Sequence, residues 1–188
     1  MKPWLLFLLL ALAFRPLTAQ RRDTLRVYLD SKLALTRKKD MIFTGLVLPS
    51  GDHWMLYAVY PDASPLVKVF FLDQKLKTKD GPVYVYYSRN QPAMQGYFVR
   101  NRREGIWKFW DESGAMKDSG LVKDNYCVGY WESRYPGGQL KEAGDYLSAE
   151  AVPAIAGMPE KRTEKNGSIL EADSLWQIRQ GSWQSWYE

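Results

Sequence analysis

The chain has 188 residues with a formal net charge of +5, and 46% of the residues are hydrophobic. That length fits one domain of ordinary size, and that apolar content is enough to fold without disulfide or metal staples. The single cysteine, Cys127, excludes an internal disulfide, and the single histidine, His53, excludes a His/Cys metal cluster with recognised spacing.

Residues 1–19 are predicted to be a signal peptide. Lys2 gives a short positive region, an apolar run extends from Trp4 to Phe14, and Leu17-Thr18-Ala19 provides a small-residue cleavage site. The apolar run is shorter than the roughly 20 residues that cross a bilayer, so a membrane helix is disfavoured. No cysteine follows the cleavage site to carry a lipid. We therefore expect an exported protein, periplasmic or secreted, with no transmembrane anchor after cleavage.

Residues 20–50 are expected to form a β lead-in that caps the rest of the fold. Leu25 to Leu29 alternates and contains a β-branched residue, which predicts a strand. Arg37-Lys38-Lys39-Asp40 is a basic run that predicts a solvated loop in preference to a contact site. Further on, Tyr60-Pro61-Asp62 is similar to Tyr135-Pro136-Gly137, which indicates a diverged copy of a later unit.

An internal repeat of 24 residues organises the chain between Gly96 and Tyr146. This step relates the following residues: Gly96, Gly120 and Gly144; Gly105 and Gly129; Trp107 and Trp131; Gly114 and Gly138; Lys117 and Lys141. A fixed period between about 20 and 50 residues marks a stacked architecture in which each unit packs on its neighbours.

Each unit is predicted to be a β-hairpin. Gly105 to Trp110 is short and aromatic, and Asp111 to Gly114 has turn composition. Three or four glycines in each unit leave no glycine-free run of the length that a helix typically needs. The fold class is therefore predicted to be all-β, a single-layer antiparallel array of β-hairpin repeats.

The array is expected to span residues 51–188. With a shift of 24 residues, Gly81 aligns with Gly105 and Asn90 aligns with Gly114. Asparagine tolerates the left-handed backbone geometry expected at that turn. A small insertion is predicted near 149–158, because the turn Asn166-Gly167-Ser168 follows its counterpart by 29 residues in place of 24. Residues 181–188 match the start of a unit, and we expect an exposed edge strand there that serves as a preferred partner site.

The repeated pattern resembles the MORN-repeat variant family. The units read Gly-x-Trp-x-x-aromatic, a turn with glycine, then Leu-Lys-x-x-Gly-x-Tyr, over roughly Gly81 to Glu188. That family occurs in bacterial exported proteins and in proteins labelled antitoxin components. The signal peptide, the opening Val27 to Asp30 and the repeats also resemble the start of certain TonB-type envelope proteins, whose further domain is not expected here. The resemblance implies a twisted sheet with a scaffolding or binding role and no catalytic residues.

The sequence holds no recognised catalytic constellation, so we expect a protein that is not an enzyme and has no cofactor. His53 is predicted to lie in a solvated loop, and Cys127 to pack as a small apolar residue. Carboxylates such as Asp118 could form an acid/base pair, but turn and surface positions are favoured for them. The glycines are spaced by the repeat and do not cluster in a phosphate-binding loop.

Two features could bind a partner. The aromatic residues form either the core of a one-layer sheet, which is favoured, or a groove for a peptide or glycan. The second feature is the group of three arginines in the turn before Gly105. They belong either to a solvated turn, which is favoured, or to a contact that binds an anionic surface through their charge. The candidate interaction residues are Arg100, Arg102, Arg103, Trp107, Trp110, Trp131, Trp183, Trp186 and Tyr187.

Three functions are compatible with these patterns. The first is a non-enzymatic exported scaffold that binds a protein or an envelope component, with no role in nucleic-acid binding. The second is an antitoxin-like neutralising protein, and the third is a hydrolase of envelope polymers. Export separates the first two, since a cytoplasmic mature chain would favour the second.

Overall fold

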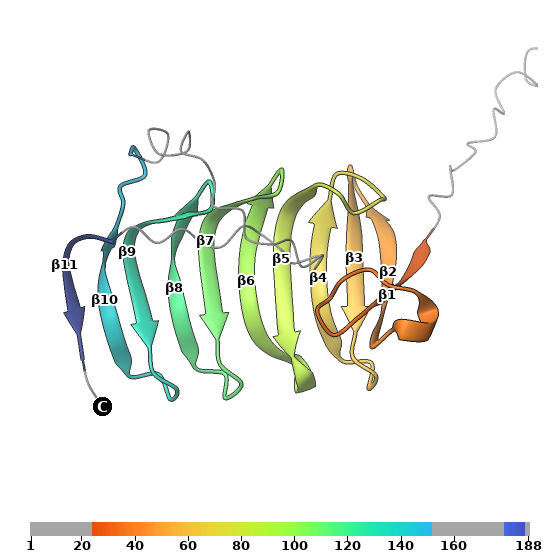
Figure 1. The fold of residues 1–188 in the computed structure, drawn as a ribbon, viewed down its shortest axis with the longest axis horizontal. Coiled ribbons are helices and arrows are strands. Elements are labelled where there is room, and N and C mark those ends of the chain that lie inside the picture. Colours follow the sequence, from red (N-terminus) through yellow and green to blue (C-terminus); the bar gives the residue numbers. More distant parts are fainter. Residues whose placement is uncertain (1–23, 152–178, 187–188) are drawn as a thin grey trace, which may run out of the picture.

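The computed structural model describes residues 24–151 and 179–186, which form one antiparallel sheet. Its eleven described strands lie side by side in sequence order, from β1 to β11 (Figure 1). The strands are β1 (Leu25–Leu29), β2 (Phe43–Ser50), β3 (His53–Val59), β4 (Pro65–Phe71), β5 (Lys79–Tyr87), β6 (Gln91–Val99), β7 (Arg102–Trp110), β8 (Met116–Lys123), β9 (Tyr126–Arg134), β10 (Leu140–Tyr146) and β11 (Arg179–Ser185). The prediction of an all-β, single-layer array of antiparallel hairpins is confirmed. Among the described residues, no helix is long and apolar enough to cross a membrane.

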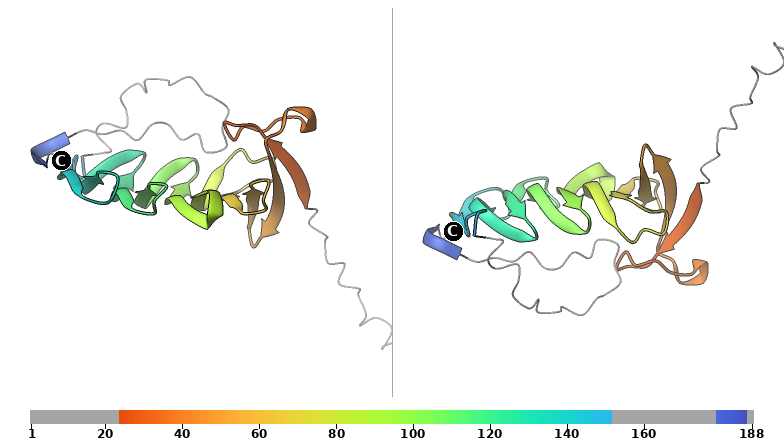
Figure 2. Two further views of the ribbon diagram at one scale, coloured as in Figure 1. Left: turned by 90° about the horizontal axis from the view of Figure 1, so that it is seen from below. Right: turned by 90° about the horizontal axis from the view of Figure 1, so that it is seen from above.

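The sheet has two distinct faces, because side chains alternate along each strand. On β4, Val67, Val69 and Phe71 are buried in the main apolar cluster, while Lys68 and Phe70 between them are only partly buried. We call the face that carries the buried cluster the inner face and the opposite one the outer face. Figure 2 views the sheet along its strands and shows one open layer, with the loop of residues 30–42 to one side of it.

The 24-residue period has a packing cause on the inner face. A Cβ atom added to Gly96 would lie 2.3 Å from the ring of Trp107, and one added to Gly120 would lie 2.2 Å from the ring of Trp131. Each tryptophan ring therefore occupies the space above a glycine on the preceding strand. Any larger residue at the glycine would displace the ring, so the two residue types recur together.

Glycine is also required where the ladder is irregular. Gly105 and Gly129 have φ angles of +74° and +61°, and each lies at a shift of strand register, between β6 and β7 and between β8 and β9. A bulge with a left-handed residue favours glycine. Asn90 and Gly114 also have positive φ, 64° and 88°, as their matched turn positions predicted.

Asparagine side chains link successive hairpins at the upper turns of Figure 1. Asn101 Oδ1 accepts a hydrogen bond from the Lys79 backbone N–H (2.7 Å), and its own N–H donates to the Lys79 carbonyl (2.8 Å). Asn125 makes the same pair of bonds to Arg103, at 2.8 and 3.2 Å. Because 24 residues separate both the asparagines and their partners, this bridge is a second element of the repeat.

Tyrosine hydroxyls link the hairpins at the lower turns. Tyr60 donates to the carbonyl of Tyr86 (2.9 Å), and Tyr87 donates to that of Trp110 (3.1 Å). The turns after Tyr60 and Tyr135 share one bonding pattern, since each tyrosine N–H donates to the carbonyl four residues later. The predicted similarity between these two segments is therefore a similarity of turn geometry.

The first strand is covered on its outer edge by the segment that follows it. Leu29 bridges to Leu35, and the Thr36 N–H donates to the Tyr28 carbonyl (2.9 Å). The predicted basic loop contains a single turn of 3-10 helix at Lys38–Asp40 with no buried residue. Such a return segment shields one edge of the sheet from further pairing.

At the other end of the sheet, β11 pairs directly with β10. Ser185 lies opposite Glu142 as Ser133 lies opposite Asp118, and Trp183 lies over Gly144 as the other tryptophans lie over their glycines. Strand β11 therefore occupies a repeat position. The predicted turn at residues 166–168 and residues 152–158 of the predicted insertion lie outside the described residues. The edge strand as a partner site stays a prediction.

Candidate functional site

The repeat tryptophans lie in the core of the sheet. Trp107 is fully buried and Trp131 is 4% exposed, which favours the core interpretation over a surface groove. The Arg103 guanidinium lies 4.6 Å from the centre of the Trp107 ring, and that of Arg179 lies 4.2 Å from the centre of the Trp183 ring. These contacts are cation–π pairs, so the cations help to bury the rings.

The three arginines before Gly105 have different surroundings. Arg100 is exposed in the turn, Arg102 forms an ion pair with Asp124 (2.7 Å), and Arg103 stacks on Trp107. The alternative in which these arginines contact an anionic surface through charge stays a prediction, and the Arg103 guanidinium also packs on an aromatic ring.

The two other described aromatic candidates lie at the lower end of the sheet. Trp110 is partly buried, and Trp186 is 39% exposed. The carbonyl of each accepts a tyrosine hydroxyl, from Tyr87 and from Tyr135. Their backbones thus belong to the inter-hairpin linkage, while the Trp186 ring contacts solvent. Tyr187 lies outside the described residues.

A row of exposed apolar side chains crosses the outer face on β6 to β9. It consists of Tyr97 (44% exposed), Ile106 (63%), Leu121 (44%) and Tyr130 (58%). Each precedes a buried inner residue in its strand, which places the row on the outer face. Ile106 and Leu121 are direct cross-strand partners. We call these four residues the outer row.

The outer row also follows the repeat. Tyr97 and Leu121 are 24 residues apart, as are Ile106 and Tyr130. Lys123 lies two residues beyond Leu121 on one side of the row, and Lys108 lies two residues beyond Ile106 on the other. Sequence patterns did not predict this row, although the residues directly before Trp107 and Trp131, Ile106 and Tyr130, were a usable signal.

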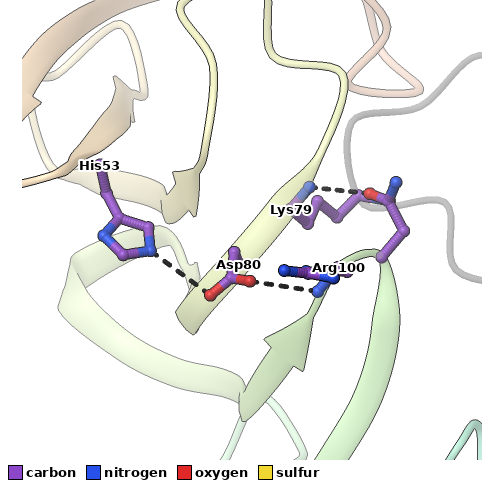
Figure 3. Close-up of polar contacts among 5 residues, drawn as sticks. His53, Lys79, Asp80 and Arg100 are labelled. Atoms are coloured by element: carbon purple, nitrogen blue, oxygen red, sulfur yellow. Dashed lines mark hydrogen bonds and ion pairs between the residues drawn. The ribbon is translucent and has the colours of Figure 1, made fainter.

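A polar cluster joins β3, β5 and the turn between β6 and β7 at the upper end of the sheet (Figure 3). His53 Nε2 lies 3.3 Å from Asp80 Oδ1, and the backbone N–H of Arg100 donates to Asp80 Oδ2 at 3.3 Å. The expected solvated loop position of His53 is wrong, because His53 is the first residue of β3 and its side chain is 33% exposed. In these contacts Asp80 connects separate hairpins, which is a structural role.

Cys127 is fully buried, as predicted for a packed thiol. Burial raises the pKa of the thiol to about 12, which the Arg103 charge only partly opposes. Cys127 lies 24 residues after Arg103 and therefore occupies the equivalent position in the next repeat, ahead of Trp131. Asp118, considered above as a possible acid or base, accepts a hydrogen bond from the Ser133 hydroxyl.

The described residues contain no group of three or more His, Cys, Asp or Glu side chains placed to hold a metal ion. No known family model matches the chain, and no curated protein matches it either. The resemblance to MORN-like repeats therefore stays a prediction.

Proposed function

We propose that this protein is an exported, non-enzymatic repeat scaffold that binds a partner protein through the outer row. The observation that carries the proposal is the row itself, four large apolar side chains exposed on four neighbouring strands, of which Ile106 and Leu121 are direct cross-strand partners. Apolar side chains scattered singly on a surface are ordinary, but a contiguous group at repeated positions is typical of an interaction site.

The spacing of the row fits an amphipathic helix lying across the strands. Neighbouring strands are about 4.8 Å apart, so Ile106 and Tyr130, two strands apart, repeat at about 9.6 Å. One heptad of an α-helix rises about 10.5 Å, and its apolar residues alternate at three and four positions. A helix with one apolar stripe would therefore place a side chain against each member of the row.

The charges beside the row indicate the polar part of that partner. Lys108 and Lys123 lie on opposite sides of the apolar side chains. Acidic residues flanking the helix stripe would meet both lysines, which would orient the partner more than it would add affinity. The predicted signal peptide supports an encounter outside the cytoplasm, and the MORN-like pattern supports a scaffolding role.

Site-specific photo-cross-linking tests the proposal in the native cell envelope. A photoreactive amino acid at Ile106 or Tyr130 should capture a common partner, and one at Leu72, an apolar residue away from the row that is 42% exposed, should not. The double change Ile106→Lys and Tyr130→Lys should abolish capture through a probe at Leu121 without lowering the melting temperature. Equal capture at Leu72, or capture that survives the double change, would contradict it.

A further inference from the structure

A polar hollow opens among the lower turns, away from the outer row. Its volume is about 460 Å³, within the range of small-molecule sites. The turns after β3, β5 and β7 supply its walls, which are lined by Tyr60, Tyr87, Ser88, Arg89, Gln91 and Glu112. Three consecutive hairpins thus meet at one place.

Hydrogen bonds to the backbone hold both tyrosine rings of the hollow in place. The Tyr60 hydroxyl donates to the carbonyl of Tyr86, and the Tyr87 hydroxyl donates to that of Trp110. Burial, followed by the charges of Asp62 and other neighbours, raises the pKa of Tyr60, so its phenol stays neutral. The rings therefore present fixed aromatic surface, and they need no ordering when a ligand binds.

The hollow is not a by-product of the repeat. Tyr87 and Tyr135 are two repeat steps apart, and the position between them is Asp111. The turns at Tyr60 and Tyr87 are therefore neighbouring turns that each carry one tyrosine, and the hollow lies there. Arg89 stands at its rim in a left-handed conformation, φ 64°, which a non-glycine residue seldom adopts.

A second, apolar recess of about 300 Å³ touches the same tyrosine. Its lining includes Met41, Ile42, Val59 and Pro61, and Tyr60 belongs to both hollows. Met41 and Ile42 are 40% and 54% exposed, so the recess is open to solvent. A ligand in the polar hollow could therefore place a small apolar group against Ile42 and Pro61.

The lining chemistry selects among ligand classes. Arg89 offers only donors, Glu112 only acceptors, and Gln91 offers both, a set that suits hydroxyl groups acting as donor and acceptor. Glu112 and the nearby Asp62 disfavour an anion, and the charged lining disfavours a purely apolar ligand. Tyrosine rings offer flat surfaces for the apolar faces of a sugar.

We propose that the hollow binds a short neutral carbohydrate chain, with an N-acetyl methyl group seated in the apolar recess. Arg89, Gln91 and Glu112 bond the hydroxyls of one sugar unit, and the N-acetyl methyl of the adjoining unit enters the recess on the other side of Tyr60, which lines both hollows. This site is separate from the outer row, so it does not depend on the proposed protein partner.

Isothermal titration calorimetry of the purified protein with three probes tests the inference. The probes are the N-acetylglucosamine trimer, the unacetylated glucose trimer of the same linkage, and inorganic phosphate. We expect the acetylated trimer to bind at least tenfold more tightly than the glucose trimer, and phosphate not to bind. Absence of binding by the acetylated trimer, or preferential binding of phosphate, would overturn the proposal.

Variants locate the binding in the hollow. The double change Arg89→Gln and Glu112→Gln should weaken binding of the acetylated trimer at least tenfold, and Ile42→Ser should remove its advantage over the glucose trimer. The control Arg37→Gln with Glu150→Gln makes the same chemical changes outside the hollow and should have no effect. Unchanged melting temperatures exclude unfolding. Binding that survives the first double change would refute the assignment of the site.

Discussion

The two parts of the sheet, β1 to β7 and β8 to β11, share one antiparallel strand pairing but carry different kinds of residue on the inner face. One unbroken row of cross-strand partners runs through all eleven described strands. From β1 to β7 this row carries Val27, Gly45, Ala58, Val67, Val85, Met94 and Phe109, and from β8 to β11 it carries Asp118, Ser133, Glu142 and Ser185. The row is apolar in the first part and polar in the second.

The difference shows what each half relies on for its packing. In β2 to β5, aliphatic residues such as Leu56, Val69 and Val83 are fully buried. From β6 onward a tryptophan ring over a glycine supplies part of the burial, and in β8 to β11 the inner positions of the row beside the rings are polar. A single-layer sheet therefore does not need a continuous aliphatic core when large rings cover its backbone.

The largest effect is expected from removing a ring in the second half. Trp131→Ala should destabilise the protein by about 4 kcal/mol, because a buried indole is lost. The inner residues beside it in the polar row, such as Ser133, cannot fill the space. Trp186→Ala, at a partly exposed ring, is the control and should cost less than about 1 kcal/mol. Chemical denaturation measures both. Equal losses would remove the distinction between repeat and edge tryptophans.

The aliphatic half should respond to a different change. Leu56→Ala should cost about 3 kcal/mol, because Leu56 is fully buried among other aliphatic side chains. Hydrogen exchange of the two variants sharpens the comparison, since Leu56→Ala should open β2 to β4 before β9 and β10. If both variants lose protection uniformly, the two halves form one cooperative unit.

Glycine at the repeat turns gives the next effect. Gly114→Val should cost about 2 kcal/mol, because Gly114 has a φ of +88° and a β-branched residue is strained there. The added side chain would also meet the Gln91 amide, whose oxygen lies 3.0 Å from where the new Cβ would stand. An unchanged melting temperature would refute the assigned role of this turn.

The arginines near the first repeat tryptophan separate packing from charge. Arg103→Gln should cost about 1 kcal/mol through the lost stacking on Trp107, whereas Arg100→Gln should be nearly neutral because Arg100 is exposed. Thermal unfolding at low and high salt checks the cause. A loss at Arg103 that disappears in high salt would indicate long-range charge in place of stacking.

The smallest effect near neutral pH concerns Cys127. Its folded pKa of about 12 lies above the ordinary thiol value of 9.0, so folding favours the neutral thiol. The resulting stabilisation is fully present below about pH 9 and is lost as pH rises toward 12. Cys127→Ala should flatten stability in that alkaline window. Rapid labelling of the native thiol at pH 8 would show that it is not buried.

Sequence patterns predicted the second half of the fold better than the first. The 24-residue period follows from Gly120 and Trp131 filling one space, so periodicity revealed the hairpins directly. Aliphatic residues such as Leu56 can exchange for one another while keeping the core filled, so the first half shows no period from which to read register.

The candidate sites were less visible for a related reason. The outer row repeats in position but not in residue type, since Tyr97 corresponds to Leu121 and Ile106 to Tyr130. The hollow combines Tyr60, from a unit whose register the sequence left open, with Glu112 from a unit 52 residues later. The turn geometry that joins them arises only when the strands pair.

The central claim is that, in a repeat strand, the inner-face residue stabilises the fold and the adjacent outer-face residue binds the partner. Tyr130 and Trp131 test it directly, because the first is 58% exposed and the second is 4% exposed. Melting temperature and cross-linking through a probe at Ile106 should be measured for Tyr130→Ser and Trp131→Phe. We predict that Tyr130→Ser abolishes capture at an unchanged melting temperature, and that Trp131→Phe lowers the melting temperature while folded protein still captures the partner. The reverse assignment, or loss of both properties in both variants, would contradict the claim.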